Sequence, residues 1–143
     1  MKYLNLFLVL SFAFVTGCGG SSSASSVKKL QGKWVIQKEA TSEYVKKSPK
    51  WTDNDEKNLP KMMEMFSTYS ITFKEKSIIL EQRGKGLEFP AELVKEEANK
   101  CEFKGKIRDS DVVLTVAIDD KGLMNYKSSL TDDMDYCMWK KAE

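Results

Sequence analysis

The chain after Thr68 alternates apolar and polar residues with a period of two, and short groups of turn residues interrupt the alternation. This pattern is typical of β-strands that bury one face and expose the other. It predicts seven strands, over residues 69–74, 78–83, 87–93, 101–107, 112–118, 123–129 and 134–140. An eighth strand is predicted earlier, over residues 30–37. Eight antiparallel strands joined by short turns predict an all-β fold, an up-and-down barrel without free edges.

A short helical insertion is predicted between the first and second strands, around residues 52–66. Its apolar residues share one helical face because they fall at i, i+3, i+4 and i+7: Leu59, Met62, Met63 and Phe66. The side chain of Thr52 can cap the N-terminus of a helix. Pro60 has no amide hydrogen to donate inside a helix, so we predict two short helices, the second starting at Pro60.

The first residues have the pattern of a processing signal. Lys2 gives a positive start, and residues 4–15 are almost entirely apolar. This run is shorter than the roughly 20 residues that a membrane-spanning helix needs, and it matches the ~7–15 apolar residues of a secretory signal. Val15-Thr16-Gly17-Cys18 then resembles the bacterial lipobox. The resemblance implies cleavage after Gly17 and lipid attached to Cys18; the alternatives are an ordinary signal peptide with a chance cysteine, or a short membrane helix.

Glycine and serine dominate the segment after Cys18, which contains no core-forming side chain up to Ser26. Such a composition is typical of a flexible tether. The sequence therefore divides into a cleaved lipoprotein signal (1–17), a lipidated cysteine with a flexible linker (18–28) and a barrel domain (29–143). The lipobox resemblance implies export and attachment to a membrane of the cell envelope through Cys18. Because Gly19 follows the cysteine where an aspartate would favour inner-membrane retention, it implies the outer membrane if the cell is Gram-negative.

Composition narrows the chemistry that this domain can perform. The 23 basic and 21 acidic residues nearly balance, so the sequence offers no strong basic patch for nucleic acid. The chain has no histidine, which removes Ser–His and Cys–His nucleophiles and the commonest metal ligand. We therefore expect no metal and no cofactor. Of the three function classes considered, which are a ligand-binding protein, a protein-binding or structural protein and an enzyme, the enzyme is the least favoured.

Gly32-Lys33-Trp34 lies in the first predicted strand. A Gly-x-Trp motif there, followed by a helical insertion and a strand meander, resembles the calycin superfamily, and in particular the small lipocalin-like domains of bacterial lipoproteins. The resemblance implies that Gly32 and Trp34 lie at the barrel floor and that Trp34 closes it. Strict lipocalins also place an arginine near the C-terminus, where this chain has Lys140 and Lys141. The alternative interpretation is an ordinary core tryptophan of another β-domain.

The remaining inward-facing side chains of the predicted barrel are mostly large: Phe73, Leu80, Phe89, Phe103, Leu114, Val116 and Tyr126. Eight-stranded barrels either fill with side chains or hold one small ligand. The favoured hypothesis is a small hydrophobic ligand inside the barrel, with the Leu59–Phe66 helix as a flexible, methionine-lined portal; the same residues are alternatively plain packing. The second hypothesis is a filled barrel that binds a protein partner, for example as a hydrolase inhibitor, or supports the envelope.

Cys101 and Cys137 allow two interpretations. Export to an oxidising compartment favours a disulfide between them. They lie on the fifth and eighth predicted strands, however, which are not neighbours in the barrel, and a bridge needs Cα atoms within about 7 Å. The sequence leaves open a Cys101–Cys137 disulfide or two separate buried thiols.

Overall fold

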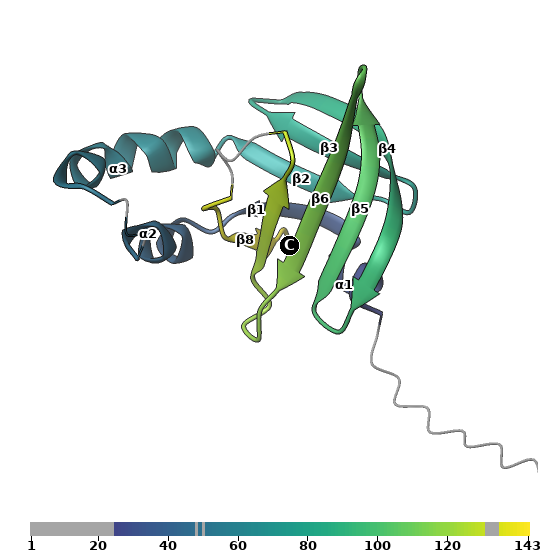
Figure 1. The fold of residues 1–143 in the computed structure, drawn as a ribbon. Helices are drawn as coiled ribbons and strands as arrows, with labels where there is room; N and C mark the ends of the chain where they lie inside the picture. The colour runs from purple at the N-terminus through teal and green to yellow at the C-terminus, as the bar shows by residue number, and fades with distance from the viewer. Residues whose placement is uncertain (1–24, 48, 50, 131–134) are drawn as a thin grey trace, which may run out of the picture.

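The computed structural model describes residues 25–47, 49, 51–130 and 135–143. They form a closed barrel of eight antiparallel strands in sequence order, which confirms the predicted all-β, up-and-down architecture (Figure 1). Helix α1 (Ser26–Leu30) precedes β1 (Gly32–Ile36), and helices α2 (Lys38–Lys46) and α3 (Asp53–Phe66) follow it. The other strands are β2 (Tyr69–Phe73), β3 (Ser77–Gln82), β4 (Lys85–Glu97), β5 (Lys100–Ile107), β6 (Ser110–Ile118), β7 (Met124–Ser128) and β8 (Trp139–Lys141).

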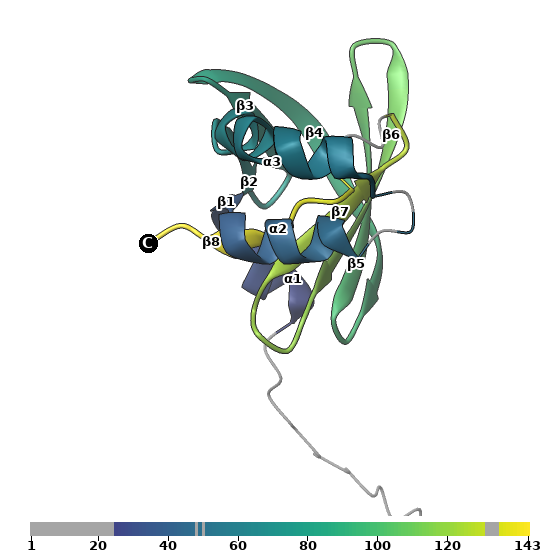
Figure 2. The same cartoon turned by 90° about the vertical axis from the view of Figure 1, so that its left-hand side faces the viewer.

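The strand directions define two ends of the barrel, which we call the floor and the mouth. The floor carries α1, the start of β1, the end of β8 and the turns β2–β3, β4–β5 and β6–β7. The mouth carries α2, α3 and the turns β3–β4 and β5–β6. Figure 2 shows α2 and α3 side by side across one side of the barrel. The N-terminal part of the chain therefore joins the barrel at the end opposite to α3.

Helix α3 begins with the predicted cap. The Thr52 hydroxyl accepts a hydrogen bond from the Asp55 N–H at 3.3 Å, and the Asp55 carboxylate accepts one from the Thr52 N–H at 2.9 Å. The predicted break at Pro60 is wrong, because α3 continues through Pro60 as one helix. Pro60 is exposed, so its ring faces solvent and the carbonyl of Glu56 can bond to water. The buried apolar face holds the helix together on the core.

Three further elements differ from the prediction. The sequence pattern does not predict α2, which is anchored by buried Val45 and by a Thr41 hydroxyl that bonds to the backbone N–H and carbonyl of Met138. The sequence pattern also does not predict α1, which begins at Ser26, whose hydroxyl donates to carbonyls of the β4–β5 hairpin at 2.6 and 2.9 Å. Strand β8 is shorter than predicted and covers three residues.

Strand β4 changes its strand partner half-way along its length. Residues 85–90 pair with β3, and residues 91–97 pair with β5. Pro90, at the change, has no amide hydrogen to offer a neighbouring strand. Its carbonyl lies so close to Gly105 of β5 that a Cβ built there would be 2.6 Å away, so only glycine fits without a backbone shift. A bulge at Val94 then shifts the pairing register.

The alternating strand residues pack into one core. Buried apolar side chains from all eight strands and all three helices belong to a single cluster. The ring centroids of Phe73 and Phe103 are 5.8 Å apart, although β2 and β5 are separated by two strands. This contact therefore crosses the interior of the barrel. Phe73 is the last residue of β2, at the floor of the barrel, so side chains fill the interior near the floor.

Candidate binding site at the barrel mouth

Trp34 of β1 lies beside helix α1, which is at the floor of the barrel. Its side chain is buried, and its indole Nε1–H donates to the carbonyl of Leu30 in α1 at 2.8 Å. The ammonium group of Lys141 lies 5.9 Å from the centroid of the indole ring, where the calycin resemblance places an arginine. Gly32 has φ +109°, a conformation that favours glycine, and a Cβ there would contact Lys141. These contacts hold Trp34 against α1 and against Lys141 of β8.

The inward-facing residues that the sequence assigns to a ligand cavity all belong to the core or pack against it. Leu80 is half-buried and the other members are buried: Phe73, Phe89, Phe103, Leu114, Val116 and Tyr126. None of these side chains lines either of the hollows described below. The structure therefore places these residues in or against the core and not in the lining of either hollow.

A hollow of about 640 Å³, the mouth hollow, lies between α3 and the β3–β4 turn. The turn is held to the end of α3 by a hydrogen bond from the Arg83 N–H to the carbonyl of Thr68, at 3.1 Å. Met62 and Met65 give the hollow an apolar side, and the rest of its lining is polar or charged: Asn58, Lys61, Glu64, Thr68 and Arg83. Lys61, Met65 and Arg83 are residues that the sequence analysis missed.

The four residues proposed as a portal have two different environments. Leu59, Met63 and Phe66 are buried against the core. Met62 is only partly buried, packs against the core from outside and also lines the mouth hollow. Met62 is therefore the side chain of this set that lies between the mouth hollow and the core.

Tyr126 of β7 packs against Trp139 of β8 in the core. The Tyr126 ring centroid is 5.6 Å from that of Trp139, whose side chain is 1% exposed. The Trp139 Nε1–H and the Asp135 Oδ1 atom are buried and have no hydrogen-bond partner among the described residues. Burial raises the pKa of Tyr126, and the nearby Cys137 and Asp135 raise it further, so the hydroxyl stays neutral. The sequence shows Trp139 only as one more alternating aromatic residue.

The described cysteines are both free and buried. Burial raises the pKa of the Cys101 thiol to about 11, with a smaller contribution from Glu96. Burial also raises the pKa of the Cys137 thiol to about 12. The structure therefore contains two separate thiols, which is the second of the two interpretations that the sequence allows.

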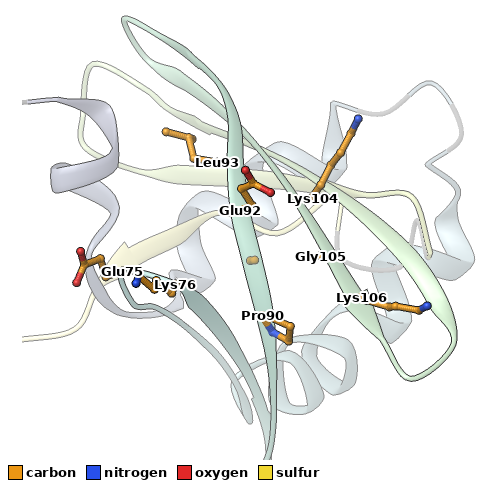
Figure 3. Close-up of a pocket in the computed structure, with 9 residues that line it drawn as sticks. Glu75, Lys76, Pro90, Glu92, Leu93, Lys104, Gly105 and Lys106 are labelled. Atoms are coloured by element: carbon orange, nitrogen blue, oxygen red, sulfur yellow. The ribbon is translucent and has the colours of Figure 1, made fainter.

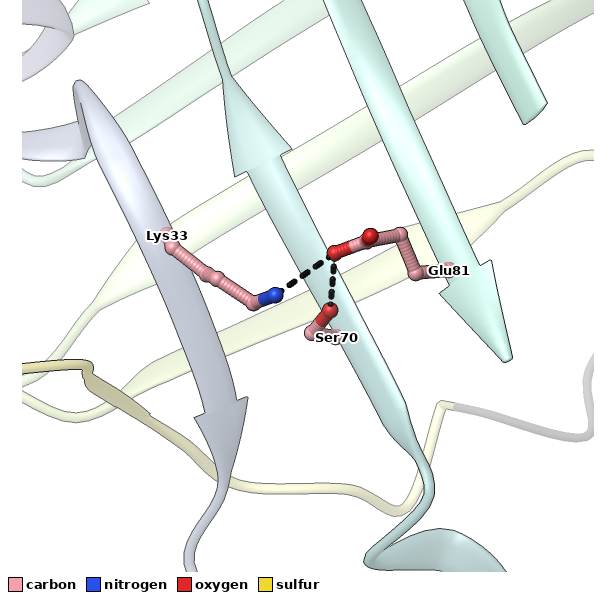
Figure 4. Close-up of polar contacts among 3 residues, drawn as sticks. All are labelled: Lys33, Ser70 and Glu81. Atoms are coloured by element: carbon pink, nitrogen blue, oxygen red, sulfur yellow. Dashed lines mark hydrogen bonds and ion pairs between the residues drawn. The ribbon is translucent and has the colours of Figure 1, made fainter. Parts of the chain in front are cut away.

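Lys33, Ser70 and Glu81 form a polar group on the outside of the barrel (Figure 4). The Glu81 Oε2 atom accepts hydrogen bonds from Lys33 Nζ at 2.7 Å and from Ser70 Oγ at 2.8 Å. These bonds lower the pKa of Glu81, that from Lys33 most. Both donors bond to one oxygen, so the lysine is not placed to accept a proton from the serine. The group links β1, β2 and β3 and fixes their register.

A hollow of about 720 Å³, the β4 hollow, lies where β4 changes partner (Figure 3). Charged residues from the β2–β3 turn, β4 and β5 surround it, with Leu93 and Ala91 as its apolar part. The charged side chains that line it, which include Lys104 and Lys106, are all exposed.

Comparison with protein-family models, with curated proteins and with solved structures found no match for this chain. Within the described residues, no helix is long and apolar enough to cross a membrane. The same residues contain no group of three or more acidic or cysteine side chains arranged to hold a metal ion. Cys18, the predicted site of lipid attachment, lies outside the described residues.

Proposed function

We propose that this chain is a lipoprotein of the bacterial cell envelope, anchored through Cys18, whose barrel binds a small, mainly apolar ligand. The ligand enters between α3 and the β3–β4 turn. The observation that carries the proposal is the mouth hollow, about 640 Å³ in volume, with Met62 between it and the core. Methionine is unbranched and flexible, so it adapts to ligands of irregular shape.

The affinity of a ligand at the mouth depends on how much apolar surface binding removes from water. Removing about 300 Å² of apolar surface from water yields ~7.5 kcal/mol at ~25 cal/mol per Å². That corresponds to a dissociation constant in the micromolar range before ordering costs are subtracted. Met65, whose side chain is 41% exposed, is part of the apolar surface that a ligand would cover.

The arrangement of the two ends supports capture from the aqueous phase. The N-terminal part of the chain joins the barrel at the floor, and the mouth hollow lies at the other end. The chain between Cys18 and Ser25 reaches at most ~25 Å when fully extended, at ~3.6 Å per residue. With lipid on Cys18, the floor therefore stays within this distance of the membrane, and the mouth, at the other end, is free to face the aqueous phase.

Ligand binding is tested with the soluble domain from Gly19 onward, which keeps every strand and helix of the described barrel. An environment-sensitive dye is titrated first, and 1-decanol and decanoate are then used to displace it. We expect saturable binding that Met62→Gln weakens about 10-fold. Lys57→Gln, at an exposed position of the same helix, is the matched control and leaves the affinity unchanged. Absence of saturable binding would refute the ligand proposal.

The anchor is tested separately in cells. Cys18→Ser removes the thiol that accepts the lipid, so we expect an unprocessed precursor without radiolabelled palmitate. The wild-type chain is expected to incorporate the label and to lose residues 1–17. Labelled palmitate on the Cys18→Ser variant would contradict lipid attachment at this position.

The second candidate function is a lipoprotein that binds a protein partner on a filled barrel. The contact between Phe73 and Phe103 across the interior favours it, because a filled barrel is a scaffold. Pull-down from envelope extract with the anchored full chain tests this candidate. A specific stoichiometric partner, together with absence of dye and decanol binding, is the result that would replace the first proposal.

A further inference from the structure

Four exposed lysines gather beside the point where the N-terminal part of the chain joins the barrel. They are Lys28 and Lys29 of α1 and Lys140 and Lys141 of β8, and we call them the basic floor surface. We propose that this surface binds anionic lipid headgroups of the membrane that carries the protein. The inference goes beyond the proposed ligand binding and rests on the lipid anchor of the proposed function, which brings the surface to a membrane.

The two pairs of lysines are far apart in the sequence and adjacent in the fold. The Lys141 Nζ atom donates a hydrogen bond to the carbonyl of Lys29 at 3.1 Å, across 112 residues of the chain. Trp34 of β1 contacts both elements, because its indole N–H donates to the carbonyl of Leu30 at 2.8 Å and its ring centroid lies 5.9 Å from Lys141 Nζ. Helix α1 and the end of β8 therefore form one continuous surface, which the balanced composition of the chain does not reveal.

The charges of the basic floor surface are not neutralised within the protein. None of its four lysines forms a salt bridge with an acidic residue of the described chain. Residues 26–33 contain no acidic residue, and residues 139–143 contain one, Glu143 at the end of the chain. The four ammonium groups are therefore available to an anionic partner.

The acidic residues that border α1 belong to β4 and already have partners. Glu97 forms a salt bridge with Lys95 at 2.7 Å. Glu96 accepts hydrogen bonds from the Ser25 hydroxyl and from the Val27 N–H, at the start of α1. The two lysines of α1 are in its last turn, on the side of β8. The excess charge that a headgroup meets at the end of α1 and at β8 is therefore positive.

The position of the surface in the chain matches a membrane partner. Ser25 directly precedes α1, and the chain between Cys18 and Ser25 reaches at most ~25 Å when fully extended. Lipid on Cys18 therefore keeps α1 within this distance of the headgroups. A short flexible tether gives an effective concentration in the millimolar range, so a weak attraction is enough to hold the surface on the membrane. The mouth hollow, at the other end of the barrel, then faces the aqueous phase.

The strength and the salt dependence of this contact follow from membrane electrostatics. Each lysine close to an anionic membrane strengthens binding about 5-fold, so four lysines give a preference of several hundred-fold over a neutral membrane. The attraction falls off within a Debye length, which shortens from ~10 Å at 0.1 M salt to ~3 Å at 1 M. A preference for anionic lipid that is lost at high salt is therefore the expected signature.

The experiment measures co-sedimentation of the soluble domain, from Gly19 onward, with two kinds of vesicle. One is made of phosphatidylcholine and the other of an equimolar mixture of phosphatidylcholine and phosphatidylglycerol. We expect the wild-type domain to bind the anionic vesicles alone and to dissociate from them at about 1 M salt. The double variant Lys28→Gln, Lys140→Gln should weaken this binding about 10- to 30-fold. The matched control, Lys57→Gln with Lys85→Gln, removes the same charge at the exposed mouth end and should change binding by less than about 2-fold.

The outcomes separate this contact from the proposed function. Equal binding to both kinds of vesicle, or absence of binding to the anionic ones, overturns the proposal, and so does equal weakening by the two double variants. Urea unfolding midpoints equal to that of the wild type show that the variants are folded. The soluble domain carries no lipid, and vesicle binding does not need the mouth hollow, so the result is independent of the palmitate and dye tests. Palmitate on the wild-type chain without vesicle binding would leave the anchor standing and refute the basic floor surface as a membrane contact.

Discussion

Replacing Trp34 tests whether one side chain holds the floor of the barrel closed. The indole ring is 2% exposed, donates to the carbonyl of Leu30 at 2.8 Å, and has the Lys141 ammonium 5.9 Å from its centroid. Trp34→Ala removes all three interactions and leaves a cavity beneath the core. Trp34→Phe keeps most of the ring and loses the hydrogen-bond donor, so the two variants separate packing from hydrogen bonding.

The magnitudes follow from these contacts. Truncating a buried aromatic residue to alanine costs ~3–5 kcal/mol, because transfer and cavity terms add. Loss of the hydrogen bond alone costs about 1 kcal/mol, and a partly exposed cation–π contact contributes a further ~0.5–1 kcal/mol. We therefore expect Trp34→Ala to lower the free energy of unfolding by about 4 kcal/mol and Trp34→Phe by about 1–2 kcal/mol.

Urea unfolding followed by far-ultraviolet circular dichroism measures both variants without relying on tryptophan fluorescence. With a slope of about 1.5 kcal/mol per molar urea, Trp34→Ala should lower the unfolding midpoint by about 2–3 M. A midpoint equal to that of the wild type would show that Trp34 does not close the floor. Equal losses in the two variants would instead show that the hydrogen bond, and not the ring, carries the stability.

Three further predictions concern the sheet and the thiols. Gly105→Ala places a Cβ 2.6 Å from the Pro90 carbonyl, so we expect a loss of about 1–3 kcal/mol in urea unfolding; an unchanged midpoint would refute the steric argument. Hydrogen bonds from Lys33 and Ser70 lower the pKa of Glu81 below its ordinary value of 4.5. Ionised Glu81 therefore stabilises the folded state above pH 4.5, and this stabilisation is lost as the pH falls below that value. In Glu81→Gln, the free energy of unfolding should therefore change less as the pH is lowered than it does in the wild type. The same dependence on pH in both proteins would contradict this prediction. Burial raises the pKa of Cys101 to about 11 and that of Cys137 to about 12. Iodoacetamide at pH 8 should therefore label neither thiol in the folded domain and both thiols in urea. Rapid labelling of either thiol in the folded domain would contradict their burial.

The period of the apolar residues was sufficient to predict the barrel, because alternation is a local property of each strand. The turns between strands are short, so sequence order also predicts neighbour order, and the structure confirms it. The same reasoning located α3, whose apolar face and Thr52 cap are both local signals. It failed at Pro60, because an exposed proline is tolerated when the rest of the helix packs on a core.

The features that the sequence could not predict depend on distant parts of the chain. Helix α2 has a narrow apolar face, and its buried Thr41 bonds to Met138, far along the sequence. The mouth hollow lies where the β3–β4 turn bonds to Thr68, just after α3. Whether the Trp139 N–H has a partner depends on what packs around it, which alternation along one strand does not reveal.

The partner change in β4 leaves part of this strand open to a neighbouring molecule. Between Glu92 and Lys95, β4 pairs with β5 on one side and with no strand on the other in the described structure, and Leu93 and Val94 are exposed there. Such an edge can add a strand from a neighbouring molecule, and lipid anchoring would confine copies to a plane where they meet often. Pro90, the bulge at Val94 and the charge on Lys95 each obstruct a regular ladder at this edge. Crowded barrels would therefore collide there without joining their sheets into a fibre.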